Sequence, residues 1–268
     1  FLITADGSDK SMRIGYDMGV MDIIEKPIVP YFVKRRVESV LELFRARKRL
    51  SNKVEVQHLQ IREQEEEIFK LNYAIIETLS TAIELRSGES GTHVKRISVL
   101  TRRLLEELRR MDPGKYGFTD DQIGQIATAA IMHDVGKIAI SDTILNKPGR
   151  LTPEEYDVMK MHTIKGCEIL ELIPQYKENQ LYRYAYDICR HHHERWDGKG
   201  YPDGLKGDEI SIWAQVVSVA DVFDALTNER VYKAAIPEKE AVAMIHEGKC
   251  GLFNPGLLQA LDHMLEAG

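Results

Sequence analysis

The chain has 268 residues, of which 43% are hydrophobic and 29% charged, a composition typical of a globular protein that can bury a full core. A formal net charge of -6 argues against a nonspecific nucleic-acid binder, because such proteins neutralise phosphates with a basic surface, although a small phosphate-bearing ligand needs only a local basic patch. Three cysteines without CxxC spacing predict reduced core thiols, and the sequence shows neither a membrane-spanning run of roughly 20 apolar residues nor a signal-peptide core. We therefore expect a cytoplasmic protein with no nucleic-acid polymer and no membrane among its partners.

The N-terminal segment, residues 1–34, contains two strand-like runs. Phe1 to Ala5 is apolar, and Val20 to Ile24 leads into Glu25-Lys26-Pro27 before an amphipathic helix that begins near Tyr31. A strand, a Lys-Pro step and a helix in this order resemble the C-terminal half of a response-regulator receiver domain. The resemblance implies a partial α/β receiver fragment over these residues and a cis bond before Pro27.

In the receiver family, the residues that match Thr4 and Lys26 sense a phosphoryl group on an aspartate. The half of the domain that carries this aspartate is absent from the sequence, and Ile23 stands where the family usually has an aromatic switch residue. The resemblance to a receiver domain implies a sensor histidine kinase as a class of partner. Because of the two departures just named, phosphorylation sensing is not carried over to this chain. A generic strand-turn-helix fragment is the alternative interpretation.

Residues 35–78 are predicted to form a long linker helix with coiled-coil character. The segment is polar and nearly free of Gly and Pro, and apolar residues recur every seven positions. These positions are Val33, Val40, Val54, Ile61, Ile68, Ile75 and Ala82, and the series is broken only by Arg47. Gln57 and Gln64 fall on consecutive inner positions, where they would weaken the seam while fixing its register. We favour a parallel homodimer through this helix over a single amphipathic helix that lies on its own domain. A dimeric helix of this kind could transmit rotation between domains.

Residues 79–268 are predicted to form an all-α domain, so that the chain as a whole is mainly α. Helix starts are clearly marked, because Thr119 and Thr152 each open a capping box and Pro255 follows Asn254 in the same style. Loops are expected at 112–118, 146–151 and 197–211. Convincing alternating strands are few.

Imidazoles and carboxylates gather at the ends of these expected helices. A polynuclear metal centre needs this combination of neutral nitrogen donors and charged oxygen donors. In chain order the candidates are Glu89 and His93 at a helix entrance, His133 and Asp134 at the end of a helix over Ile123–Met132, His162 within the helix that Thr152 starts, His192 and His193 at the end of another helix, and Asp221 in an apolar helix over Val216–Leu226. A single histidine of this kind is weak evidence, whereas several separated clusters of one chemistry favour a shared site.

Several ordered motifs in this region resemble an HD-GYP domain, a branch of the HD phosphohydrolase superfamily. They are His-Asp-Val-Gly-Lys at 133–137, Lys-Pro-Gly-Arg-Leu-Thr at 147–152, His-His-Glu followed by Gly-Tyr-Pro between 192 and 202, and Asp-Val-Phe-Asp-Ala-Leu-Thr at 221–227. The resemblance covers roughly residue 79 to the C-terminus. It implies an all-α HD-type helical domain that acts as a metal-dependent phosphodiesterase on cyclic di-GMP, giving linear pGpG and in some members GMP.

Carried over position by position, the resemblance implies a set of metal ligands, which are His93, His133, Asp134, His162, His192, His193 and Asp221. Asp134 is the expected bridge between two metals. Glu89 would support a third, because family members with glutamate at this position can hold three metals and members with tyrosine hold two. A solvated charge or a helix cap is the alternative for Glu89. Two or three divalent ions are expected, and mixed nitrogen and oxygen ligands favour iron or manganese without excluding zinc or nickel.

Such a centre would hydrolyse a phosphodiester with a metal-bound hydroxide, because cations lower the pKa of bound water from about 15.7 towards 7. Asp134 and Lys137 are the expected catalytic residues, with Lys137 placed to neutralise charge that develops on the phosphate. A surface lysine at a helix end is the alternative for Lys137. By resemblance, Arg230 and Lys233 contact substrate phosphates. Tyr201 could stack or hydrogen-bond near the substrate, or its Gly-Tyr-Pro loop could only order the residues beneath the metals.

Other residues of similar type are expected to serve no metal. His191, His246 and His263 are left outside the candidate centre. Trp196 and Trp213 are expected to be core aromatic residues rather than a platform for guanine.

Three functions remain open from the sequence. Hydrolysis of cyclic di-GMP is the first, and it implies a diguanylate cyclase that makes the substrate. The second is hydrolysis of another cyclic dinucleotide such as cyclic GMP-AMP, because base selection depends on pocket walls that the motifs do not define. The third is a non-catalytic cyclic di-GMP sensor that acts through protein contacts, although a sensor has no chemical need for a complete set of metal ligands.

Overall fold

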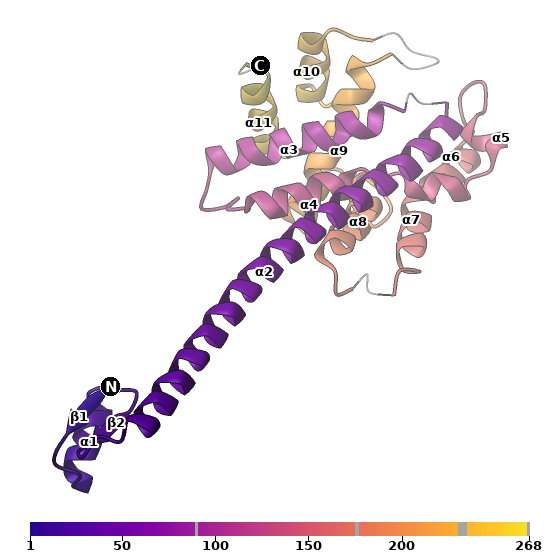
Figure 1. Ribbon diagram of the computed structural model, residues 1–268. Coiled ribbons are helices and arrows are strands. Elements are labelled where there is room, and N and C mark those ends of the chain that lie inside the picture. Colours follow the sequence, from indigo (N-terminus) through magenta and orange to yellow (C-terminus); the bar gives the residue numbers. More distant parts are fainter. Residues whose placement is uncertain (89–90, 175–176, 230–234, 267–268) are drawn as a thin grey trace. The chain divides into compact units, whose positions relative to one another are not determined.

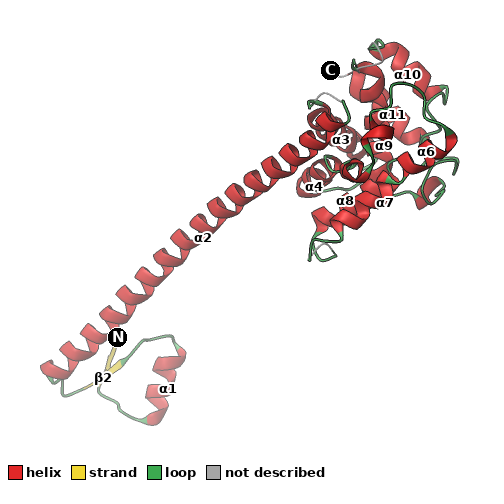
Figure 2. Ribbon diagram, turned by 90° about the vertical axis from the view of Figure 1, so that its right-hand side faces the viewer, coloured by secondary structure: helices red, strands yellow, loops and turns green. Residues whose placement is uncertain are grey.

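The computed structural model describes residues 1–88, 91–174, 177–229 and 235–266. The chain divides into two compact units, Phe1–Lys70 and Leu71–Gly268. Within the described residues, β-strands occur only in the first unit and helices make up most of the chain (Figure 2). The prediction of a mainly α chain is therefore confirmed.

The first unit begins with a small parallel sheet. Strand β1 (Leu2–Thr4) pairs with β2 (Ile23–Glu25), and helix α1 (Asp9–Asp17) connects them. Ile23 and Ile24 are buried, whereas the residues of β1 remain largely exposed. The prediction of a strand-like run from Val20 to Ile24 was wrong at its start, because the residues from Val20 to Asp22 precede β2. The Lys26–Pro27 bond is cis.

Helix α2 (Pro30–Arg86) is longer at both ends than the predicted linker. No glycine or proline interrupts residues 31–87, and the helix ends just before Gly88, whose positive φ of 72° favours glycine. Its apolar heptad positions are exposed in the single chain, with Val54, Ile61, Ile68 and Ile75 between 42% and 59% exposed. A long exposed apolar stripe is typical of a helix that pairs with a partner, and the homodimer stays a prediction.

The second unit is a bundle of helices around one apolar core (Figure 1). Its helices are α3 (His93–Met111), α4 (Asp120–Ala130), α5 (Asp142–Leu145), α6 (Pro153–Lys160), α7 (His162–Leu170), α8 (Gln180–His191), α9 (Ile212–Thr227), α10 (Glu238–His246) and α11 (Pro255–Glu266), with the short 3-10 helices η1 (Val135–Ala139) and η2 (Gly207–Glu209). Helix α3 packs against α4, α9 and α11, and α8 packs against α4, α7 and α9. Helix α9 is apolar over most of its surface, because it lies between α3, α8 and α10.

The predicted helix starts are confirmed at atomic detail. The Thr119 side chain accepts a hydrogen bond from the Gln122 amide while Gln122 accepts one from the Thr119 amide. Thr152 and Glu155 form the same reciprocal pair at the start of α6. Each box satisfies amides that would otherwise lack partners at a helix N-terminus.

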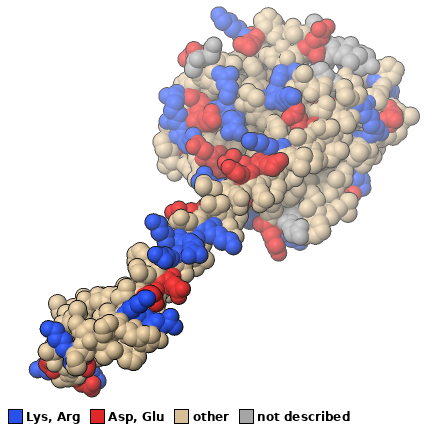
Figure 3. All heavy atoms as spheres, in the orientation of Figure 1, with Lys and Arg blue, Asp and Glu red and all other residues tan. Residues whose placement is uncertain are grey.

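Acidic and basic side chains are interspersed on the face of the second unit that Figure 3 shows. Within the described residues, the structure contains no helix with both the length and the apolar character to span a bilayer. Cys167 and Cys189 are buried free thiols, as the sequence predicted, whereas Cys250 is a free thiol that is only partly buried against the core.

Candidate metal centre

The candidate ligands lie where helices of the second unit begin or end. His133 and Asp134 occupy a tight turn between α4 and η1, because the amides of Met132 and His133 bond to carbonyls only three residues back. The predicted helix over Ile123–Met132 therefore ends earlier, at Ala130.

The prediction that His162 lies inside the helix started by Thr152 was wrong. Helix α6 ends at Lys160, and His162 is the first residue of α7. The chain changes direction at Met161, whose amide bonds to the Val158 carbonyl three residues back while its carbonyl accepts from the Lys165 amide. The break separates two short helices and places His162 at their junction.

Two glycines bring His162 close to the His133–Asp134 turn. A Cβ on Gly136 would lie 1.9 Å from the carbonyl oxygen of His162 and 2.4 Å from the amide nitrogen of Gly166. A Cβ on Gly166 would in turn lie 3.4 Å from the Gly136 nitrogen. The backbones of η1 and α7 therefore touch at Gly136, at a distance that only glycine permits.

The candidate ligand atoms form two adjacent clusters. One contains Asp134, His162, His192 and His193, and the other contains His93, His133 and Asp221; within each cluster the potential ligand atoms lie within 4.8 Å of one another. His93 begins α3, Asp221 lies in α9, and His192 and His193 directly follow α8. Side chains from five parts of the sequence thus meet at one place.

Hydrogen bonds orient four of these histidines in the same way. The Nδ1 atom of His133 lies 2.9 Å from the Ala130 carbonyl, that of His162 lies 2.8 Å from the Met159 carbonyl, and that of His192 lies 2.9 Å from the Ile188 carbonyl. A carbonyl only accepts, so each Nδ1 carries a proton, and in the neutral ring each Nε2 presents a lone pair. The fourth histidine, His93, directs Nδ1 to the carboxylate of Asp224 at 2.6 Å.

Asp134 lies between the two clusters. Its Oδ2 is 3.2 Å from His133 Nε2, and its Oδ1 is 3.2 Å from His162 Nε2 and 3.9 Å from His192 Nε2. The Lys137 ammonium lies 2.6 Å from Oδ2, and only 14% of the Lys137 side chain is exposed. The structure therefore places Lys137 against the candidate centre and not on the open surface.

Burial and charge act in opposite directions across the clusters. Burial disfavours an imidazolium at His133, but the carboxylates of Asp134, Asp221 and Glu84 outweigh it and raise the pKa of His133 to about 9. Burial, together with the neighbouring His133, lowers the pKa of His192 to about 3. Burial would raise the pKa of Asp134, yet Lys137 and His133 hold that pKa well below its ordinary value. Burial thus favours a neutral His192, the neighbouring carboxylates favour a protonated His133, and Asp134 stays ionised.

The sequence interpretation missed the groups that orient His93. Asp224 is buried, accepts from Nδ1 of His93, and pairs with the guanidinium of Arg96, whose NH2 lies 2.9 Å from Oδ2. A carboxylate that fixes the far nitrogen of a ligand histidine is a common outer partner in metal sites. Asp224 lies three residues after Asp221 in α9. Residues three apart lie on the same side of a helix, and this spacing is the sequence signal that could have identified Asp224.

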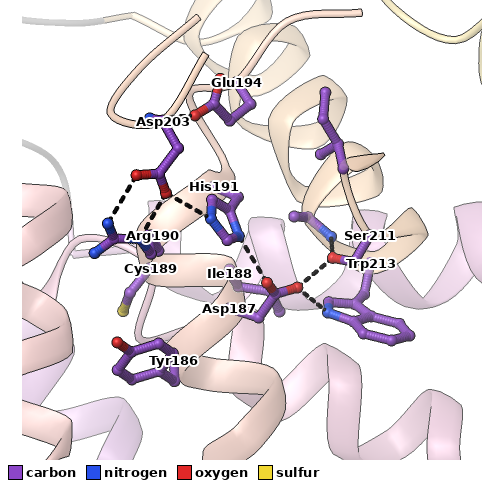
Figure 4. Close-up of polar contacts among 12 residues, drawn as sticks. Tyr186, Asp187, Ile188, Cys189, Arg190, His191, Glu194, Asp203, Ser211 and Trp213 are labelled. Atoms are coloured by element: carbon purple, nitrogen blue, oxygen red, sulfur yellow. Dashed lines mark hydrogen bonds and ion pairs between the residues drawn. The ribbon is translucent and has the colours of Figure 1, made fainter. Parts of the chain in front are cut away.

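The Gly-Tyr-Pro loop is held against the end of α8 by Glu194 and Asp203 (Figure 4). Glu194 is buried, and its Oε1 accepts from the amides of Asp203 at 2.7 Å and Gly204 at 3.0 Å. The Asp203 carboxylate accepts from two nitrogens of Arg190, at 2.6 and 2.8 Å. A Cβ on Gly200 would lie 2.3 Å from the Cα of Glu194, so glycine is needed for this close approach.

His191, which the sequence left outside the centre, lies in neither cluster. Its Nδ1 is 2.7 Å from Asp187 and its Nε2 is 3.0 Å from Asp203, so the ring bridges two carboxylates (Figure 4). Burial lowers the pKa of His191, but the two aspartates outweigh this effect and raise it overall. Asp187 also accepts from the Ser211 hydroxyl and from the indole of Trp213, which is packed against the core.

Tyr201 packs directly on a candidate ligand. Its ring stacks on His193 with centroids 4.7 Å apart and meets the ring of Tyr156 edge-on at 6.3 Å. Burial raises the pKa of Tyr201, which keeps the phenol neutral. The observed contact is with His193, in keeping with the interpretation that the loop orders the ligands. Of the remaining candidates, Glu89, Arg230 and Lys233 lie outside the described residues.

Divalent metal ions fit the residues at this place. The Nε2 atom of His133 and the Oδ1 atom of Asp134 are buried, and neither has a hydrogen-bond partner within the described parts of the chain. Buried polar atoms are almost always satisfied, so a cation beside each of these two atoms would satisfy both. Imidazole and carboxylate donors suit first-row divalent metals.

The chain is similar to proteins of a known family. A family model described as HD domain matches residues 77–255, and the chain belongs to this family. It is 33% identical over 260 residues to a probable cyclic di-GMP phosphodiesterase of Vibrio cholerae serotype O1, covering 96% of this chain and 59% of that protein. It is also 37% identical over 187 residues to 3'3'-cGAMP-specific phosphodiesterase 2 of the same organism, covering 70% of this chain and 34% of that protein.

The chain spans less than two thirds of the length of both curated relatives. Among solved structures, a cyclic GMP-AMP specific phosphodiesterase of V. cholerae aligns with a TM-score of 0.50 at 16% identity, covering 72% of this chain and 48% of that one. At this identity the likeness concerns the fold alone. It agrees with the all-α architecture of the second unit.

Proposed function

We propose that this chain is a metal-dependent phosphodiesterase that hydrolyses cyclic di-GMP to pGpG, with GMP as a further product. The observation that carries the proposal is the orientation of four buried histidines, each of which uses Nδ1 on an oxygen acceptor and turns Nε2 towards its cluster. A chain that only binds a nucleotide has no need for this arrangement. The names of the relatives support a cyclic dinucleotide as the substrate class.

Two or three divalent cations, with iron or manganese favoured, would be held by the proposed ligands His93, His133, Asp134, His162, His192, His193 and Asp221, and by Glu89 for a third. When bound, such ions supply an activated water and stabilise negative charge on phosphoryl oxygens. Asp134 contributes the charged oxygen that both clusters share, and the neighbouring Lys137 ammonium offsets negative charge at the reacting phosphate. Tyr201 keeps the His193 ring in place, and Arg230 and Lys233 are proposed contacts for the substrate phosphates.

The test is a product assay on purified protein loaded with Mn²⁺ or Fe²⁺ and incubated with cyclic di-GMP. We expect cyclic di-GMP to disappear and pGpG to accumulate, as followed by anion-exchange chromatography, and a chelator should stop the reaction. Binding of cyclic di-GMP without turnover at every metal loading would instead establish a sensor that acts through protein contacts.

Hydrolysis of cyclic GMP-AMP is the second candidate. A relative named for this substrate is 37% identical over 187 residues, and a relative of the same organism named for cyclic di-GMP is 37% identical over 186 residues, so both substrates are tested. The same assay separates the two candidates, since a kcat/KM for cyclic GMP-AMP above that for cyclic di-GMP would assign the chain to the second substrate.

We further propose that the chain forms a parallel homodimer through the apolar stripe of α2. Light scattering should give a mass twice that of the chain, and Ile61→Glu combined with Ile68→Glu should give the single-chain mass, because both side chains are at least 50% exposed in one chain and would lie inside the seam. Val56→Glu is the matched control, since Val56 is equally exposed but lies off the heptad positions. A wild-type protein that stays monomeric at high concentration would contradict the proposal.

A sensor histidine kinase acting through an upstream receiver, and a diguanylate cyclase that supplies the substrate, are the proposed partner classes. The kinase is proposed from the resemblance of residues 1–34 to a receiver domain. The cyclase is proposed because it makes the proposed substrate.

A further inference from the structure

Arg86 is the last residue of α2, and its guanidinium lies at the end of η1. Nη1 donates to the carbonyls of Lys137 at 3.1 Å and Ile138 at 2.9 Å, and Nη2 donates to the carbonyl of Ile140 at 2.8 Å. Nη2 also lies 2.8 Å from the carboxylate of Asp142. One side chain therefore gathers four acceptors from the segment 137–142.

A guanidinium suits the end of η1 for two physical reasons. The last carbonyls of a helix have no partners within the helix and carry a partial negative charge, which favours a cation beside them. The guanidinium is planar and presents several N–H donors in a fixed fork, so it can satisfy more than one carbonyl at once, whereas a lysine ammonium is a point charge. Since η1 is a 3-10 helix, whose internal hydrogen bonds have poorer geometry than those of an α-helix, we expect this support to matter for its shape.

The groups that η1 brings to the candidate centre depend on this support. Asp134 directly precedes η1, and Lys137 lies inside it with its ammonium 2.6 Å from Oδ2 of Asp134. Arg86 bonds to the carbonyl of this same Lys137. A second support of η1 is its backbone contact with α7 at Gly136. The short helix is thus held on α7 at Gly136 and on α2 at its last carbonyls.

The segment that follows η1 also binds the main chain of Arg86. The side-chain amide of Asn146, which directly follows α5, donates to the Arg86 carbonyl at 3.1 Å. Residues 137–146 therefore contact the last residue of α2 through both its side chain and its main chain. A displacement of Arg86 must either move η1 or break these bonds.

From this geometry we propose that Arg86 is a positioning residue of the metal centre, which acts through η1 to fix Asp134 and Lys137. The inference rests on the proposed metal-dependent function and extends it, because it makes the last turn of α2 a support of the reacting groups. Loss of the guanidinium should loosen η1, displace the Lys137 ammonium from Asp134 and lower turnover, although no metal ligand is removed.

The first test measures η1 directly and needs neither metal nor substrate. Hydrogen exchange of residues 135–142 is followed by mass spectrometry in wild type, Arg86→Gln and the matched control Arg109→Gln. Arg109 also donates to a main-chain carbonyl, that of Phe118 at 3.0 Å, and pairs with the carboxylate of Asp120 at 2.7 Å. Its side chain is 34% exposed, against 33% for Arg86. We expect exchange to be at least about 10-fold faster in Arg86→Gln, because charge-assisted hydrogen bonds are lost, and unchanged in Arg109→Gln.

The second test measures turnover of the Mn²⁺-loaded proteins. For Arg86→Gln we expect kcat for cyclic di-GMP to fall at least about 10-fold while KM stays within about 2-fold of wild type, because the reacting groups are misplaced. Arg109→Gln should keep the wild-type kcat. Arg86→Lys, which keeps the charge but satisfies fewer carbonyls, should recover part of the lost kcat. A role in stability alone would lower the unfolding midpoint and leave kcat per folded molecule unchanged.

The outcomes separate this inference from the proposed function. Unchanged exchange of residues 135–142 in Arg86→Gln, or faster exchange with an unchanged kcat, would overturn the inference and leave the proposed function in place. If Arg86→Gln does not fold, the same two measurements on Arg86→Lys decide between these outcomes. Absence of turnover in the wild-type protein at every metal loading would overturn the proposed function and the positioning role with it.

Discussion

Replacing Asp134 with asparagine is expected to lower turnover of cyclic di-GMP by at least about 100-fold, because one charged ligand shared by two clusters is lost. The carboxylate lies within 3.2 Å of the Nε2 atoms of both His133 and His162, and it is the partner of the Lys137 ammonium. An amide keeps the shape of the side chain but removes its charge. It also removes the charge that pairs with the Lys137 ammonium at 2.6 Å, which further disfavours cations at the site.

The measurement is the initial rate of cyclic di-GMP hydrolysis at saturating metal, with bound metal determined on the same samples. Asp262→Asn serves as the control. Asp262 lies on α11 and forms an exposed pair with His246, the last residue of α10, so this replacement should leave the rate unchanged. Full turnover and full metal content in Asp134→Asn would show that Asp134 is not the shared ligand.

A second large effect is expected for Gly136→Ala, which should lower the free energy of unfolding by about 3 kcal/mol or more. The added methyl group would lie 1.9 Å from the His162 carbonyl oxygen and 2.8 Å from its carbonyl carbon, so η1 and α7 must move apart. Because His162 begins α7 and Asp134 precedes η1, the same movement separates ligands of one cluster. We therefore expect metal affinity to fall together with stability.

Urea unfolding monitored by circular dichroism measures this difference, and Gly124→Ala is the matched control. Gly124 lies inside α4, where a Cβ would meet nothing closer than 3.8 Å, so alanine should stabilise the helix by up to about 1 kcal/mol. Equal unfolding midpoints for wild type and Gly136→Ala would show that the backbone contact is not as tight as described.

Local signals explain why much of the fold could be predicted. The capping boxes at Thr119 and Thr152 act within four residues, and the absence of Gly and Pro from 31–87 lets one helix run from Pro30 to Arg86. The motif spacings likewise pointed to the residues that the structure brings into the two clusters. Errors arose where packing overrides local preference, as at Met161, where the contact of η1 with α7 accompanies a break that the residue pattern does not signal.

The amino-acid sequence by itself determined the helical class, the helix starts and the imidazole and carboxylate groups available to a metal, because each depends on residues close together in the chain. Only the tertiary structure decided which atoms meet. The contact of His93 with Asp224 joins residues 131 positions apart, and that of Arg86 with the Lys137 carbonyl joins residues 51 apart. No local pattern encodes such pairs, since they form only when the helices pack. For the same reason, Glu84 reads as one more charge on a polar helix until the fold buries it beside His93.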